Sequence, residues 1–260
     1  MDDLRITTIQ TNLYWEDIDQ NLVHFEEKVN AINEQTDIIV LPEMFTTGFT
    51  MNPKVLAESH GDKGLQWMQR KSKEKNCVLV GSISVKDGEK FYNRLYWVMP
   101  DESYQSYDKR HLFQMGKEDV HYTAGSKKFV VEYKGWKICP LICYDLRFPV
   151  WSRNTKENTY DVLVYVANWP EVRSYPWKQL LIARAIENQA YVVGVNRIGQ
   201  DGNAITHSGD SCILNPRGEI ISKTKAHEDV SETLNLSFSY LEEFRKVFPV
   251  MLDGDEFSVL

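Results

Sequence analysis

The segment ICPLICYDLRFP, Ile138–Pro149, decides how this sequence is interpreted. Its first half is an apolar run that suits a buried strand, and the run ends on Cys143. The polar and aromatic residues of Tyr144–Pro149 then leave the sheet abruptly, as an exposed nucleophile on a strand-to-helix turn would. A cysteine at the end of an apolar run is usually a small buried hydrophobe. We interpret the remaining cysteines of the chain in that way: Cys77, Cys139 and Cys212.

Two other apolar runs also end beside a residue that can do chemistry. Asp37–Pro42 is short, β-branched and nearly continuous, which suits a strand covered on both faces, and Glu43 follows it. Tyr104–Asp108 is followed by Lys109. Open α/β sheets place their ligands at the carboxyl ends of strands. A carboxylate, an ammonium and a thiol gathered there would supply a base, a cation and a nucleophile for attack on a carbonyl.

Short apolar runs alternate with helical patterns along the rest of the chain. We expect strands at Leu4–Thr11, Cys77–Val85, Phe91–Met99, Phe129–Tyr133, Trp136–Cys143, Tyr160–Ala167, Ala190–Val195, Asp210–Leu214, Glu219–Ser222 and Val230–Leu236. We expect helices at Ile18–Ile32, Gly64–Lys75, Phe148–Lys156, Pro176–Ile186 and Tyr240–Val247. No linker interrupts the pattern, so we expect one α/β domain, residues 1–260, with helices covering the sheet faces. The lack of a glycine-rich phosphate loop argues against a dinucleotide fold.

Composition excludes several classes of function. The 260 residues are 42% hydrophobic and carry 30 basic against 37 acidic side chains, for a net charge of −7. That balance argues against disorder and against a surface that binds nucleic acid or an acidic membrane. No apolar run is long enough to span a bilayer, and the N-terminus is charged, so we expect a cytoplasmic protein. The four cysteines form no Cys-x-x-Cys pair of the kind used in zinc or redox sites.

Three motifs of this chain resemble the Glu, Lys and Cys signatures of the nitrilase superfamily of carbon–nitrogen hydrolases, in the same order and spacing. They are LPEMF at Leu41–Phe45, DKRHLF at Asp108–Phe113 and CPLICYDLRFP at Cys139–Pro149. Downstream, Ala185–Val193 and Gly209–Ser211 with Pro216–Glu219 are also similar to family patterns. The resemblance therefore runs along nearly the whole chain.

The resemblance implies a four-layer α-β-β-α sandwich that associates through its helices into a homodimer or a higher homo-oligomer. The C-terminal tail, about residues 240–260, is then a candidate for a subunit interface. The resemblance also implies a cysteine amidohydrolase that needs no metal and no cofactor. Its substrate would be a small amide.

The resemblance also implies a role for each motif residue. Cys143 would attack the amide carbon, and Lys109 with the backbone N–H of Tyr144 would hold the tetrahedral oxyanion. Glu43 would act as general base, passing the thiol proton to ammonia and later activating water. Glu118, before Gly125, corresponds to the family's second glutamate and would orient Lys109 and the substrate.

The residue chemistry agrees with these roles. A free thiol is only a few per cent thiolate at neutral pH, so it needs a base within reach or a nearby cation, and Glu43 and Lys109 supply one each. His111, two residues past Lys109, is the nearest candidate for an alternative Cys–His pair. The histidines form no His-x-His or His-x-x-x-His pair, so a metallohydrolase is disfavoured.

Within the superfamily the chain looks most like the bacterial omega-amidases, which release ammonia from the terminal amide of 2-oxoglutaramate or 2-oxosuccinamate. Lys109–Phe113 with Glu118, Ala167–Glu171 and Phe244–Pro249 are the segments that resemble that group. Such a substrate carries an anionic oxo-acid end, which needs a cation.

Our candidates for the substrate-binding cations are Arg173 and Arg147. Aromatic side chains are candidates for the walls of a narrow pocket that favours short substrates: Phe45, Phe49, Tyr144 and Trp169.

Other functions fit the same residues. An amidase for deaminated glutathione, an N-carbamoyl hydrolase or a true nitrilase would use the same catalytic residues, because these residues act only on the group that is cleaved. A non-catalytic binding member of the fold is a further alternative, against which the intact Glu43, Lys109 and Cys143 argue. A peroxide sensor would need Cys139 as partner to Cys143, about 13 Å away along a strand and too far for a disulfide.

Overall fold

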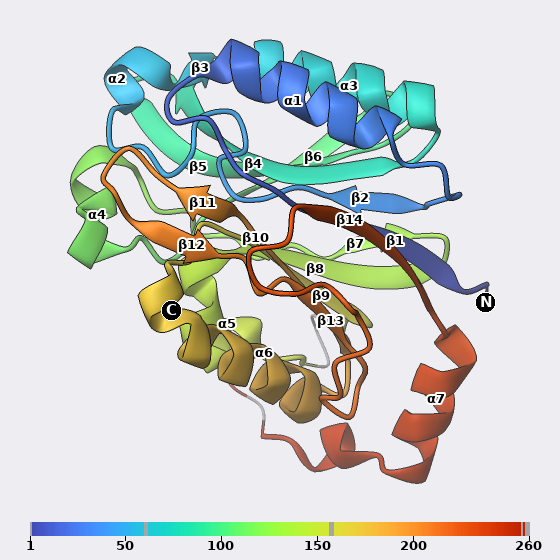
Figure 1. Ribbon diagram of the computed structural model, residues 1–260. Coiled ribbons are helices and arrows are strands. Elements are labelled where there is room, and N and C mark those ends of the chain that lie inside the picture. Colours follow the sequence, from blue (N-terminus) through green and yellow to red (C-terminus); the bar gives the residue numbers. More distant parts are fainter. Residues whose placement is uncertain (1, 60–61, 156–158, 256, 258–260) are drawn as a thin grey trace.

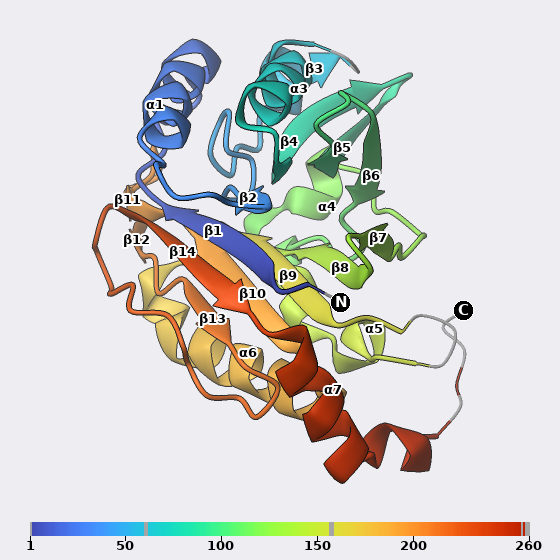
Figure 2. The same ribbon diagram turned by 90° about the vertical axis from the view of Figure 1, so that its right-hand side faces the viewer.

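The computed structural model describes residues 2–59, 62–155, 159–255 and 257, which form a four-layer α-β-β-α sandwich (Figure 1). Two β-sheets face each other. Helices α1 (Ile18–Asn30) and α3 (Lys63–Lys75) cover the outer face of the first sheet, and α6 (Ser174–Asn188) covers the outer face of the second (Figure 2). The predicted α/β class and layer order are confirmed.

The first sheet has the order β14-β1-β2-β4-β5-β6, with β3 beside β4. Its strands are β1 (Leu4–Gln10), β2 (Ile38–Val40), β3 (Glu58–Ser59), β4 (Val78–Asp87), β5 (Lys90–Val98), β6 (Tyr104–Asp108) and β14 (Val230–Leu236). The second has the order β13-β10-β9-β8-β7. Its strands are β7 (Val131–Tyr133), β8 (Trp136–Ile142), β9 (Val162–Ala167), β10 (Tyr191–Asn196) and β13 (Cys212–Leu214).

The remaining elements lie around these layers. A separate hairpin pairs β11 (Ile198–Gln200) with β12 (Thr206–Ser208). The other helices are α2 (Pro53–Leu56), α4 (Glu118–His121), α5 (Pro149–Ser152) and α7 (Phe238–Val247), and short 3-10 turns cover Gln114–Gly116, Cys143–Arg147, Glu171–Arg173 and Val250–Asp253. Within the described residues, no helix has the length and apolar character needed to span a bilayer.

Strand β2 shows why the sheets stack in this way. Ile38 and Val40 belong to the core between the two sheets, whereas Ile39 belongs to the core beneath α1 and α3. Because neighbouring side chains of a strand point to opposite faces, a continuous apolar run is buried on both sides. The prediction that Asp37–Pro42 contains a strand covered on both faces is confirmed.

Strand directions bring several carboxyl ends to the same end of the molecule. Strands β1, β2 and β4 run parallel, and β6 shares their direction because β5 is antiparallel to both β4 and β6. In the second sheet β8, β9 and β10 run parallel. Residues that follow β2, β6, β8 and β9 can therefore meet.

Two predicted elements were wrong. The helix expected at Phe148–Lys156 ends at Ser152, because the Asn154 side chain bonds the backbone of Tyr160 and competes with helical bonding; residues 156–158 lie outside the described residues. The strand expected at Glu219–Ser222 is reduced to one isolated bridge between Ile220 and Leu214.

The core between the sheets yields a stability prediction. Ile38→Ala removes a fully buried side chain there and should lower the free energy of unfolding by about 2 to 5 kcal/mol. Val23→Ala is the control: Val23 lies on α1 and is 62% exposed, so this substitution should change the free energy of unfolding by less than about 0.5 kcal/mol. Urea unfolding at one protein concentration measures both, and equal effects would contradict this packing.

Candidate active site

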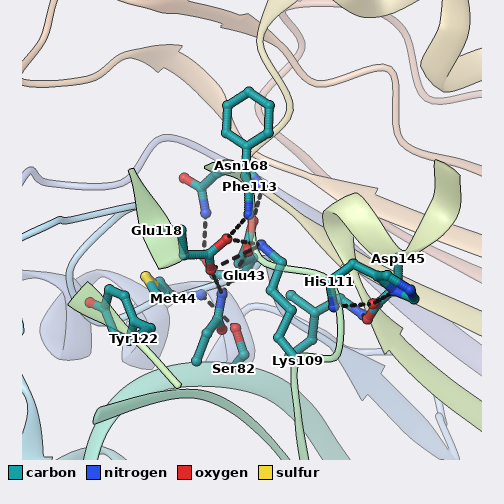
Figure 3. A network of polar contacts seen from close by, with 12 residues as sticks. Glu43, Met44, Ser82, Lys109, His111, Phe113, Glu118, Tyr122, Asp145 and Asn168 are labelled. Atoms are coloured by element: carbon teal, nitrogen blue, oxygen red, sulfur yellow. Dashed lines mark hydrogen bonds and ion pairs between the residues drawn. The ribbon is translucent and has the colours of Figure 1, made fainter. Parts of the chain in front are cut away.

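The structure brings three of the predicted catalytic side chains together near the carboxyl ends of the strands: Glu43, Lys109 and Glu118 (Figure 3). Lys109 Nζ lies 2.8 Å from Glu43 Oε1 and 2.9 Å from Glu118 Oε2. The Glu43 carboxylate and the Lys109 ammonium both act on the Cys143 thiol: the carboxylate raises its pKa and the ammonium lowers it. All these side chains are buried. The arrangement is an ammonium held between two carboxylates, with a thiol whose pKa responds to the ammonium and to one of these carboxylates.

Glu43 is held by the loop that follows β2. The Leu41 N–H donates to the Val80 carbonyl at 2.7 Å, and the Met44 N–H donates to Ser82 Oγ at 2.8 Å. Met44 has a φ of +43°, in the left-handed region that few residues other than glycine adopt. This sharp turn directs the Glu43 side chain toward the second sheet.

Lys109 directly follows β6, and its N–H donates to the Asn93 carbonyl at 3.0 Å. The Gly125 N–H donates to the Lys109 carbonyl at 2.9 Å, and a Cβ at Gly125 would lie 2.1 Å from the Asp108 carbonyl oxygen. Only glycine fits there. This close approach returns the chain segment that contains Glu118 to the lysine.

Cys143 is the first residue of the 3-10 turn that follows β8. Its φ is +41°, a conformation that costs of order 1–3 kcal/mol for a residue with a side chain. The surrounding structure must therefore hold this turn. The predicted turn at the end of the strand is confirmed, but the predicted exposure of the nucleophile is wrong, because Cys143 is buried.

Two asparagines that the sequence analysis missed complete the polar shell. The Asn168 N–H donates to Glu43 Oε2 at 2.8 Å, and Asn93 Nδ2 donates to Glu43 Oε1 at 2.8 Å and to Glu118 Oε1 at 3.2 Å. Asn168 directly follows β9, so the strand-end argument that selected Glu43 applies to it as well. Asn93 is a polar residue in a largely buried stretch of β5.

The electrostatics favour a neutral thiol and a charged lysine. Burial raises the pKa of Cys143 well above its usual value, the Glu43 carboxylate raises it further, and Lys109 lowers it. Burial lowers the pKa of Lys109, but Glu118 and Glu43 outweigh burial and leave the pKa above its usual value. Burial raises the pKa of Glu118, against the effect of Lys109. The thiol therefore needs a base in direct contact to lose its proton.

A cavity of about 140 Å³ opens above Cys143. Its lining includes most of the predicted substrate-binding residues: Tyr144, Arg147, Trp169, Arg173 and Phe49. The β11–β12 hairpin adds a wall that the sequence analysis did not foresee, with Asp201, Asn203, Ile205 and His207.

Phe45 was wrongly predicted to line this pocket. The turn at Met44 sends Phe45 to the opposite face of the first sheet, where its ring lies 5.4 Å from Phe25 and 5.7 Å from Trp67. Phe45 is a core residue beneath α1 and α3.

Both predicted arginines lie over aromatic rings of the pocket. The Arg147 guanidinium is 4.9 Å from the Trp169 ring, and that of Arg173 is 5.4 Å from the Phe113 ring. In the described part of the chain neither guanidinium forms a salt bridge. Each is therefore a cation available to an anionic ligand.

His111 is engaged elsewhere. Its Nδ1 lies 2.8 Å from Asp145 Oδ1, so the structure does not support a Cys–His pair with Cys143. Among residues 2–59, 62–155, 159–255 and 257, no group of three or more His, Cys, Asp or Glu side chains is arranged to hold a metal ion.

The family follows from comparison with known proteins. The carbon-nitrogen hydrolase family model matches residues 5–246. This chain belongs to the carbon-nitrogen hydrolase family. The chain is 47% identical to the protein named omega-amidase YafV of Escherichia coli K12, over 100% of both chains. It is 32% identical to the 2-oxoglutaramate amidase of Bacillus subtilis, over 95% of this chain and 96% of that one.

A solved structure supports the same assignment. The CN-hydrolase superfamily protein XC1258 of Xanthomonas campestris, which has an arsenic adduct in its active site, superposes with a TM-score of 0.97. It is 39% identical and covers 100% of both chains. The resemblance of the sequence motifs to the carbon–nitrogen hydrolases is confirmed.

The site predicts opposite effects of two substitutions on the thiol. Glu43→Gln removes the anion that raises the Cys143 pKa, so alkylation should begin at lower pH. Lys109→Met removes the cation that lowers the pKa, so alkylation should begin at higher pH. Iodoacetamide labelling followed by intact mass across pH measures both, with Cys143→Ala as the background. Shifts in the same direction would contradict the geometry.

Proposed function

We propose that this carbon-nitrogen hydrolase is an omega-amidase that hydrolyses the terminal amide of 2-oxoglutaramate or 2-oxosuccinamate. The observation that carries the proposal is the buried Lys109 ammonium, 2.8 Å from Glu43 and 2.9 Å from Glu118, beside a Cys143 thiol whose pKa the Glu43 carboxylate raises. The full-length similarity to omega-amidase YafV and to 2-oxoglutaramate amidase supports the substrate class.

Acylation begins with transfer of the Cys143 proton to Glu43 while the sulfur attacks the amide carbon. The amide oxygen becomes an oxyanion that the Lys109 ammonium and the backbone N–H of Tyr144 stabilise. One such donor contributes roughly 2.7–4 kcal/mol to lowering the barrier. Glu43 then gives the proton to the departing nitrogen, so ammonia leaves and a thioester remains on Cys143.

Deacylation uses the same groups. Glu43 accepts a proton from water, and the hydroxide attacks the thioester carbon. Lys109 stabilises the second oxyanion, the carbon–sulfur bond breaks, and Glu43 returns the proton to the Cys143 sulfur. The products are the oxo-dicarboxylate and the free thiol. Glu118 keeps the Lys109 ammonium oriented through both steps, because its two oxygens accept from Nζ at 2.9 and 3.1 Å.

The pocket supports a short substrate with an anionic end. A cavity of about 140 Å³ lined by Phe49, Tyr144 and Trp169 limits chain length. Arg147 and Arg173 line the same cavity and provide the cations that an oxo-acid carboxylate requires.

Several wider properties remain predictions. We propose that residues 1–260 work as one carbon-nitrogen hydrolase domain in a cytoplasmic homodimer or higher homo-oligomer. The C-terminal tail from about residue 240, with Val247, Phe248 and Leu252 exposed, contributes to the subunit interface in this proposal. Size-exclusion chromatography with light scattering measures the assembly.

Cys143→Ala should abolish ammonia release from 2-oxoglutaramate, by more than about 10³-fold. Cys77→Ala, a buried cysteine beneath α1 and α3, is the matched control and should retain activity. The assay includes 2-oxosuccinamate, deaminated glutathione, an aliphatic nitrile and an N-carbamoyl amino acid. Preference for any of the last three would overturn the omega-amidase assignment, and activity retained by Cys143→Ala would overturn the mechanism.

Arg173→Ala should raise KM for 2-oxoglutaramate by roughly tenfold or more, since a hydrogen bond to a charged group contributes about 1.5–3 kcal/mol. KM for a neutral amide of similar length should stay unchanged. Arg147→Ala is measured in parallel to identify which arginine binds the carboxylate. Arg217→Ala is the control, because the Arg217 guanidinium packs over Tyr240 and Phe244. Equal effects on both substrates would make Arg173 structural.

A further inference from the structure

Asp145 is a fully buried carboxylate two residues beyond Cys143 that the proposed reaction does not use. Its Oδ1 accepts from the backbone N–H of His111 at 3.0 Å and from His111 Nδ1 at 2.8 Å. Its Oδ2 accepts from the Tyr107 hydroxyl at 2.8 Å and from the Ile142 N–H at 3.1 Å. Both oxygens therefore have two donors, as a buried carboxylate requires.

These four donors come from both halves of the active site. Tyr107 lies two residues before Lys109, and His111 lies two residues after it. The Ile142 N–H directly precedes Cys143. Figure 3 shows His111 and Asp145 beside Lys109. One carboxylate thus joins the chain segment that positions the ammonium to the turn that positions the thiol.

We propose that Asp145 is a positioning residue. It fixes the turn that contains Cys143 relative to the end of β6 that carries Lys109, and His111 is its main partner across the two sheets. The inference rests on the proposed reaction for its kinetic consequence, but not for its geometry.

The architecture explains why such a link is needed. Lys109 follows a strand of the first sheet and Cys143 follows a strand of the second, and no strand pairing joins these two sheets in the described residues. Apolar packing between sheets is non-directional, so it does not by itself fix where two strand ends stand relative to each other. Hydrogen bonds with defined geometry do fix this relation.

Backbone strain gives a second reason. The left-handed φ of Cys143 persists only if neighbouring contacts hold the turn. The bond from the Ile142 N–H to Asp145 Oδ2 closes this turn from inside. The same oxygen also accepts from the Tyr107 hydroxyl, so it connects the turn to β6.

The donors to Asp145 are themselves fixed. The His111 ring stacks on Phe148 with centroids 3.7 Å apart and planes 6° apart. The Tyr107 hydroxyl also accepts from Trp151 Nε1 at 3.0 Å and from the Arg110 N–H at 3.2 Å. A change at Asp145 would therefore act on a rigid shell rather than on side chains that can rearrange.

Asp145→Asn tests the inference with little change in volume. The amide cannot accept hydrogen bonds at both ends, and a backbone N–H can only donate, so the bond from the His111 N–H or the bond from the Ile142 N–H is lost. A displacement of about 1 Å at the reacting groups costs about 10²-fold in rate. We expect kcat on the best wild-type substrate to fall by that factor, with KM changed by less than about threefold.

Asp161→Asn is the matched control. Asp161 is also a buried carboxylate, and it accepts from the Lys137 N–H at 2.9 Å and from Arg245 at 2.6 Å, away from the active-site residues. This variant should lower the unfolding temperature and leave kcat unchanged, measured well below that temperature. If Asp145→Asn lowers kcat no more than Asp161→Asn does, Asp145 is merely structural and the proposal fails.

Cys143 alkylation provides a readout that needs no substrate. Loss of the link should move Lys109 away from the thiol, so iodoacetamide labelling of folded Asp145→Asn should begin at higher pH than in wild type. An unchanged labelling profile would overturn the proposal, even if no oxo-acid amide proved to be a substrate. Failure of the omega-amidase assignment is thereby distinguished from failure of this inference.

Tyr107→Phe covers the case in which Asp145→Asn does not fold. It removes the hydroxyl, and with it one of the four bonds to Asp145 and the bonds from Trp151 Nε1 and the Arg110 N–H. We expect a smaller loss of kcat, about three- to tenfold, and a smaller shift of the labelling profile in the same direction. Wild-type values for both quantities would overturn the proposal.

Discussion

The buried Lys109 ammonium and its two carboxylates are the constraint on which the rest of the site depends. Removing a charge from water costs several kcal/mol, which only close and well-bonded opposite charges offset. Glu43 and Glu118 do so at 2.8 and 2.9 Å, and Asn93 donates to both of them. Breaking such a cluster by removing one partner leaves an unpaired buried charge, at a typical cost of 3–5 kcal/mol. The chemistry and the stability of this region are therefore coupled.

The four-layer fold creates this cluster by bringing strand ends from two separate sheets to one place. Within each sheet, backbone hydrogen bonds fix the register of the strands. Between the sheets the contacts are mostly apolar side chains, so polar links have to set the final geometry. The Asn168 N–H bonds Glu43 from the second sheet, and Asp145 bonds Tyr107 and His111 of the first. Each link joins a pair of strand ends that carries the reacting groups.

The same arrangement separates reactivity from selectivity. The proton transfer between Cys143 and Glu43 involves only the amide group that is cleaved. Arg147, Arg173 and the β11–β12 hairpin line the pocket around the rest of the substrate. A member of the carbon-nitrogen hydrolase family can therefore change its substrate by changing pocket walls without disturbing the buried ion pairs. The neutral thiol that burial enforces is consistent with this separation, because Cys143 becomes nucleophilic only when Glu43 takes its proton.

The sequence by itself determined the α/β class, the strand that is covered on both faces, and Glu43, Lys109 and Cys143, because each of these residues lies at the end of a predicted strand. The four-layer order and Glu118 came from the family resemblance alone. Only the tertiary structure revealed Asn93 and Asp145 as partners, because Asn93 lies 50 residues from Glu43 and Asp145 lies 34 from His111. Phe45 was misplaced because a left-handed turn at Met44 reversed its direction. Local patterns report which residues are buried and where a strand stops, but hydrogen bonds between distant strand ends depend on how the two sheets stack.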